Sequence, residues 1–185
     1  MISVDDFKQL LLEKDAKSIV RNHILYGKCS ALNDQLYPEL KNQIATRFDI
    51  HPNQVLVVGS AKTGFSIAPN KRFRTFSDIS DIDVCIVSDK IFEFYWLETY
   101  KKYLREPYWP NGDRFIQYFF RGWIRPDMLP SPISKVWFEY FRELTTSSVF
   151  GPYKISAGLY KSWEHLEAYQ IDCVAKCIEH EKENA

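Results

Sequence analysis

Two carboxylates and a glycine-serine pair have the residue types and spacing for chemistry on phosphate. Asp81 and Asp83 open the apolar run 84–87, and an earlier run, 55–58, ends directly before the pair Gly59-Ser60. Short β-branched runs bounded by turn formers predict buried strands. Because side chains alternate along a strand, two acids spaced by two residues share one face, with Cα atoms roughly 6–7 Å apart. Two hard oxygen ligands on one face suit Mg²⁺, which takes its other ligands from water and phosphate.

The glycine-serine pair predicts a place where phosphate can approach the backbone. Gly59 has no Cβ, and Ser60 offers a hydroxyl and an N–H group at the expected start of a helix. Each feature alone is common, so the prediction depends on their order along two predicted strands. Together they predict a phosphate cradle beside a metal-binding face, which suits nucleotide phosphoryl chemistry.

The order of strand, Gly-Ser, spacer and the segment 80–84, Ser-Asp-Ile-Asp-Val, resembles the core signature of the nucleotidyltransferase superfamily with the DNA polymerase β-like fold. The resemblance covers residues 55–88 and extends more weakly to 130. It implies a Mg²⁺-dependent enzyme, with two ions expected and Mn²⁺ as a substitute. Such an enzyme transfers a nucleoside monophosphate from a nucleoside triphosphate to an acceptor hydroxyl and releases pyrophosphate. Asp81 and Asp83 would be catalytic metal ligands, and Gly59-Ser60 would bind the nucleotide.

The resemblance also implies a third carboxylate on a strand beside the Asp-x-Asp strand. Some members of the superfamily write it as Asp, two apolar residues and Pro, and Asp127 matches this pattern. Asp127 is therefore expected to be catalytic and to bind metal, because a third carboxylate could complete a second ion site and help deprotonate the acceptor hydroxyl. Pro126 cannot donate to a strand ladder, so Asp113 is an alternative, and a site without a third carboxylate is another.

Basic residues fill the segment between the Gly-Ser pair and the acids. Lys62, Arg72 and Arg74 are predicted to bind the nucleotide, because their charges could hold a triphosphate or an acceptor phosphate. A solvated loop would carry the same residues without any such role. Trp109 or Trp123 could stack on a base, although core packing is the more common use of an aromatic ring.

The elements that must position these residues predict an α/β (α+β) fold, in which a small mixed β-sheet is flanked by helices from the N- and C-terminal segments. Strands are expected near 54–59, 82–87 and 115–124. The N-caps Ser3 and Ser88 predict helices after them, the second over 91–105. The chain is expected to form one nucleotidyltransferase-like domain, 1–185, with a helical cover, a catalytic core and C-terminal helices. These parts span 1–50, 54–130 and 131–185, with a loop at 145–156 and a last helix from about 162 to 181.

Composition indicates a folded cytoplasmic protein that does not enter a membrane. The content is 45% hydrophobic and 26% charged, with no signal-peptide pattern at the start and no apolar run long enough to span a bilayer. The 24 basic and 24 acidic residues give a formal net charge of zero, which argues against general coating of nucleic acid. The four cysteines have neither zinc-site spacing nor the pattern of a disulfide framework.

The acceptor is not specified by these residues. The superfamily modifies small molecules, tRNA ends, proteins and other nucleotides. At 185 residues the chain lacks room for the large helical half with which many relatives bind their acceptor, so a homo-oligomer or a partner protein is expected. The alternative function is a catalytically silent relative that binds a nucleotide or a partner protein.

Overall fold

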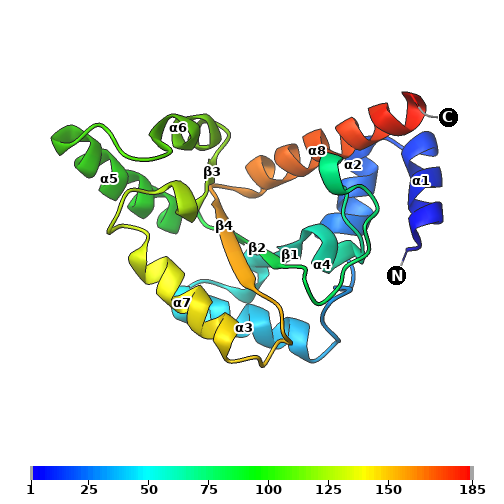
Figure 1. Ribbon diagram of the computed structural model, residues 1–185, viewed down its shortest axis with the longest axis horizontal. Coiled ribbons are helices and arrows are strands. Elements are labelled where there is room, and N and C mark those ends of the chain that lie inside the picture. The colour runs from blue at the N-terminus through cyan, green and yellow to red at the C-terminus, as the bar shows by residue number, and fades with distance from the viewer. Residues whose placement is uncertain (1, 184–185) are drawn as a thin grey trace.

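A computed structural model describes residues 2–183, which contain one open mixed sheet of four strands (Figure 1). The strands are β1 (Val55–Val58), β2 (Ile82–Val87), β3 (Trp123–Ile124) and β4 (Ile155–Tyr160). Their order across the sheet is β1-β2-β4-β3. The pairs β1–β2 and β3–β4 are antiparallel, whereas β2 and β4 are parallel. The coarse prediction of a mixed α/β fold is therefore confirmed.

One face of the sheet is covered by three helices, α3 (Leu36–Phe48), α5 (Asp89–Arg105) and α7 (Lys135–Thr146). Their apolar side chains pack on alternate residues of the strands, as the pleat of a strand requires. The strand residues in this cluster include Val55, Val57, Ile82, Val84, Ile86 and Leu159, all at most 2% exposed. We call this side of the sheet the closed face.

The opposite face is covered only in part. The helices α1 (Val4–Glu13), α2 (Ala16–Ile19) and α8 (Trp163–Glu183) pack over a cluster that includes Leu56, Cys85, Val87 and Tyr160. Asp83, Ser156 and Gly158 point to the same side, because each is an even number of residues from Cys85 or Tyr160 on its own strand. These three line a cleft. We call this side the α8 face.

Local caps fix the helix starts that the sequence predicted. The Ser3 hydroxyl accepts from the backbone N–H of Asp6 at 3.1 Å, and that of Ser88 accepts from Ile91 at 3.3 Å. The shorter helical segments are α4 (Gly59–Thr63), α6 (Gly112–Phe120), the π-helical η1 (Val20–Leu25) and the 3₁₀ turns η2 (Pro52–Gln54), η3 (Pro69–Lys71) and η4 (Pro126–Met128). Of the helices in residues 2–183, none combines the length and the apolar character that a membrane crossing requires.

The strand predicted at 115–124 is wrong for most of its length. α6 occupies residues 112–120, and only residues 123–124 pair in the sheet. The Phe115 and Phe119 rings, one helical turn apart, stack with centroids at 5.8 Å, and Phe119 stacks on Phe92 of α5 at 5.4 Å. Packing on α5 therefore stabilises a helix in spite of the β-propensity of these aromatic residues.

The predicted loop at 145–156 is wrong at both ends, because α7 continues to Thr146 and β4 begins at Ile155, beside β2. Ile155, Ala157 and Leu159 alternate with Ser156 and Gly158, which is the period of a strand. The small residues at 156–158 have low strand propensity and obscured that alternation. The last helix was predicted correctly, since α8 runs from Trp163 to Glu183.

Candidate active site

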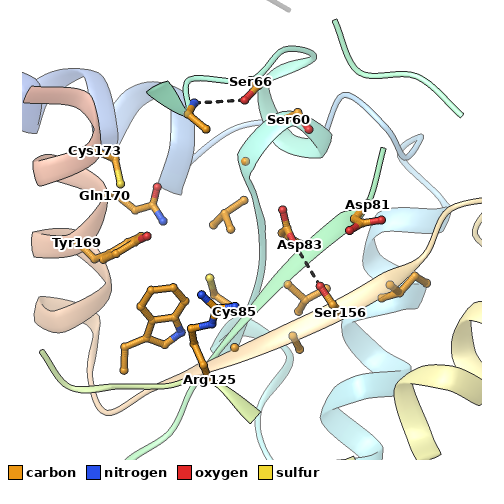
Figure 2. A pocket seen from close by; sticks show the side chains of 18 of the residues that line it. Ser60, Ser66, Asp81, Asp83, Cys85, Arg125, Ser156, Tyr169, Gln170 and Cys173 are labelled. Carbon is orange, nitrogen blue, oxygen red and sulfur yellow. Dashed lines mark hydrogen bonds between the residues drawn. The ribbon is translucent and has the colours of Figure 1, made fainter. Parts of the chain in front are cut away.

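A cleft of about 990 Å³ opens on the α8 face of the sheet (Figure 2). It is lined by α4 and the loop that follows it, by β2 and β4, and by parts of α7 and α8. Gly59, Ser60, Asp81 and Asp83 all contribute to its wall. The structure therefore brings together the four residues that carried the sequence prediction.

Asp83 lies where β1, β2 and β4 meet. It is opposite Val58 in the antiparallel β1–β2 pair and opposite Ser156 in the parallel β2–β4 pair. The Ser156 hydroxyl donates to Asp83 Oδ1 at 3.2 Å. Asp83 is the one exposed residue of β2, and its side chain lines the cleft. A ligand can thus reach this carboxylate directly.

Loss of water raises the pKa of the Asp83 carboxyl, because desolvation disfavours its charged form. The hydrogen bond from Ser156 opposes this rise, the negative charge of Asp81 adds to it, and the positive charges of Lys154 and Lys71 oppose it more weakly. A bound cation would stabilise the charged form at the same place. Of these influences, the negative charge of Asp81 favours binding of a positive ion beside Asp83.

Gly59 forms the corner between β1 and α4 and lies against the Asp83 carboxylate. Its φ is +64°, a conformation that glycine adopts easily and other residues rarely do. A Cβ atom at this position would lie 3.4 Å from Asp83 Oδ2. Ser60 follows in the first turn of α4 and also lines the cleft. The missing side chain of Gly59 therefore lets this corner lie close to the Asp83 carboxylate.

Asp81 lies directly before β2, on the same side of the chain as Asp83 (Figure 2). Its side chain is 49% exposed, and its Oδ2 atom is 4.0 Å from Lys154 Nζ. This long, exposed ion pair is weak and would yield to a stronger ligand. Asp81 thus supplies a second carboxylate that is free to turn toward a cation.

Of the three basic residues predicted to bind nucleotide, the cleft is lined only by Arg74. Lys62 is 3% exposed, and its ammonium group donates to the Gly27 carbonyl at 2.6 Å. Arg72 donates to the Lys176 carbonyl of α8 at 3.0 Å. Lys62 and Arg72 therefore hold other parts of the fold together.

Asp127 lines the cleft but already has a partner. It belongs to η4, and its two carboxylate oxygens accept from the Arg125 guanidinium at 3.1 and 2.8 Å. Asp113 lies in the first turn of α6 and does not line the cleft. The strand beside β2 is β4, where Ser156 occupies the position next to Asp83. The structure thus places a hydroxyl where the resemblance implies a third carboxylate.

Several residues of the cleft were missed from the sequence, because they come from segments without a motif. Ser156 and Lys154 belong to the overlooked strand β4 and its start, and Gln170 lies on the inner side of α8. Period-two alternation could have located β4, but no sequence signal pairs it with β2.

Trp123 lines the cleft, whereas Trp109 donates to the Met128 carbonyl at 2.8 Å and packs on Phe115, so Trp109 is a core residue.

Comparison with protein-family models, with curated proteins and with solved structures finds no match for this chain. The residues of the cleft therefore carry the functional proposal.

Proposed function

We propose that this protein is a Mg²⁺-dependent nucleotidyltransferase, which transfers a nucleoside monophosphate from a nucleoside triphosphate to an acceptor hydroxyl. The observation that carries the proposal is that the Gly59 corner lies next to the Asp83 carboxylate, so that a Cβ at Gly59 would be 3.4 Å from Oδ2, with Asp81 beside it in a cleft. This arrangement puts a place for phosphate next to a place for a cation.

The donor set fits Mg²⁺, which binds proteins through one or two carboxylates and completes its shell with water and phosphate oxygens. Asp81 and Asp83 would hold the ion. When bound, Mg²⁺ supplies charge neutralisation for the triphosphate and for the transition state. Asp83 is the stronger anchor in this proposal, since the Ser156 hydroxyl holds its carboxylate in place.

The residues around the carboxylates would orient the triphosphate. Gly59 and Ser60 would contact its phosphates through the backbone and the Ser60 hydroxyl. Lys71 and Arg74 also line the cleft and would balance its negative charge. The oxygen of the acceptor would then form a bond to the α-phosphorus, while the bond from that phosphorus to the bridging oxygen breaks and pyrophosphate leaves. The hydroxyl proton would pass to solvent water, because Asp127 is paired with Arg125 and both Asp81 and Asp83 would hold the ion.

The size of the cleft leaves room for an acceptor. Its volume of about 990 Å³ is at the upper end of the range for a pocket that holds one small ligand. A nucleotide bound at the Gly59 corner would therefore leave part of the cleft to a small acceptor or to a segment of a larger one. Small molecules, tRNA, proteins and nucleotides all remain within the proposal.

A direct test is incubation with α-labelled nucleoside triphosphates, Mg²⁺ and representatives of each acceptor class, followed by measurement of labelled product and pyrophosphate. We expect turnover by the parent protein and none by the Asp83→Ala variant. Asp113→Asn is the matched control, because Asp113 is an acid outside the cleft, and its turnover should equal that of the parent.

A second candidate function is a catalytically silent protein that binds nucleotide. Two observations favour it: the carboxylate of Asp127 is paired with Arg125, and β4 presents Ser156 beside Asp83. Mg²⁺-dependent nucleotide binding without pyrophosphate release, with every acceptor class present, would select this function over transfer.

A further inference from the structure

The cleft has a second end, under α8, where polar groups lack protein partners. Gln170 is 6% exposed and lines the cleft, and its amide points inward from α8 (Figure 2). Within residues 2–183 no side-chain hydrogen bond involves this amide, and its atoms are not among the fully buried ones that lack a partner, so the amide is open to the cleft. It offers two donors and an acceptor there. A ligand in the cleft can therefore supply their partners.

Trp123 provides a second unsatisfied group at the same end. Its Nε1–H is buried and has no hydrogen-bond partner among the described residues. A Cβ atom on Gly158 would lie 2.6 Å from this nitrogen, so only glycine allows the indole to lie so close to β4. The Trp123 ring stacks on Tyr160 at 5.5 Å and contacts Tyr169 at 4.6 Å. Since Tyr169 precedes Gln170 on α8, this contact locates the amide at the aromatic end.

The two ends of the cleft lie along one strand. Ser156, Gly158 and Tyr160 are alternate residues of β4 on the α8 face, so each step between them is roughly 6–7 Å. Ser156 lies at the carboxylate end of the cleft, where its hydroxyl is hydrogen-bonded to Asp83. Tyr160 lies at the aromatic end, where its ring stacks on that of Trp123. A ligand with phosphates at one end and a flat polar ring at the other would follow this line.

On the basis of the proposed function, we infer that the α8 end of the cleft binds the nucleobase of the triphosphate, with the Gln170 amide contacting its polar edge. An amide can donate and accept at once, which matches the adjacent donor and acceptor groups on the edge of a base. The neighbouring aromatic rings provide apolar contact for the base. Gln170 is then a specificity-determining residue.

The test is calorimetric titration with Mg²⁺ and no acceptor. The probes are the α,β-methylene analogues of the four common nucleoside triphosphates, which cannot undergo transfer, and inorganic tripolyphosphate, which has no base. For the parent protein we expect at least one analogue to bind about tenfold more tightly than tripolyphosphate. Gln170→Leu should lower that affinity about tenfold and reduce the differences among the four bases to about twofold.

Binding of tripolyphosphate shows whether each variant is still folded, because this ligand uses only the carboxylate end of the cleft. Its affinity should stay within about twofold in Gln170→Leu and in the second variant, Gln170→Met, because neither change touches the carboxylate end. Gln117→Leu, an exposed residue of α6 outside the cleft, should leave every affinity unchanged.

Two failures are distinguishable. If the analogues bind Gln170→Leu as tightly as the parent, or no more tightly than tripolyphosphate, the base site is refuted while the proposed function stands. If neither tripolyphosphate nor any analogue binds the parent in a Mg²⁺-dependent way, the proposed function itself is refuted, and the base site with it.

Discussion

The two faces of the sheet use the same strands for different purposes. On the closed face, residues such as Ile82, Val84 and Ile86 of β2 are covered by three helices and are almost fully buried. On the α8 face, the cover over β2 stops after Cys85, and Asp83 is accessible from the cleft. One face thus supplies a dry core, and the incomplete cover of the other leaves two carboxylates within reach of a ligand. On this sheet, side-chain alternation thus separates the residues that stabilise the fold from those that could carry out chemistry.

The largest effect that would separate the faces comes from Asp83→Asn. This change keeps the shape of the side chain and removes the charge that we expect to hold a cation. Nucleotide transfer should fall by about 10³-fold, the equivalent of several kcal/mol of lost charge stabilisation. The melting temperature in the absence of Mg²⁺ should stay the same or rise, because a desolvated charge is removed. A large loss of stability would mean that Asp83 is a structural residue.

The converse change is Trp137→Ala on the closed face. Trp137 of α7 is 1% exposed and packs against Phe141 at 5.3 Å and Tyr95 at 5.6 Å. Its removal should lower the free energy of unfolding by about 3–5 kcal/mol, through lost burial and a residual cavity. Urea denaturation followed by circular dichroism measures this, and a loss below about 1 kcal/mol would contradict a tightly packed closed face.

A smaller effect should distinguish the Gly59 corner from an ordinary glycine turn. Gly59→Ala places a methyl group 3.4 Å from Asp83 Oδ2 and strains a positive φ. We expect transfer to fall about tenfold or more, with a stability loss of about 1 kcal/mol. Gly27→Ala is the matched control, since Gly27 has a φ of +81° and no atom within 4 Å of a built Cβ. Gly27→Ala should lose similar stability and keep its transfer rate; equal activities of the two variants would argue against a phosphate site at Gly59.

The smallest effect is a change in pH dependence. Because desolvation raises the pKa of Asp83 on folding, the folded protein binds this proton more readily than the unfolded chain. Its contribution therefore favours folding at acid pH, and that contribution is lost as the pH rises from the usual carboxyl range through the raised pKa. Mg²⁺ should stabilise the protein mainly above this window, where the carboxylate is charged.

Ser156→Ala tests the same titration from the neighbouring strand. The lost hydrogen bond would raise the pKa of Asp83 further, so Mg²⁺ stabilisation and transfer should both begin at a higher pH than in the parent. Thermal melts with and without Mg²⁺ across the acid range measure the shift. In Asp83→Asn the Mg²⁺ response should be absent at every pH, and a persisting response would place the cation elsewhere.

Prediction from sequence worked where local physics decides the structure. The β-branched runs around 55–58 and 82–87 form the strands expected of them, and the Ser88 cap starts its helix. It failed at 115–124, where aromatic residues with high strand propensity form α6 because they pack on α5. The local signal there favoured the wrong element, and only the distant partner reversed it.

The sequence by itself determined the two strand ends, the Gly59 turn and the spacing that puts Asp81 and Asp83 on one face, since each depends on neighbouring residues and the pleat of a strand. Only the tertiary structure decided what surrounds Asp83. Parallel pairing brings Ser156 to it from 73 residues away, and α8 carries Gln170 over the far end of β4. Such contacts follow from the burial of whole faces, so no local pattern encodes them.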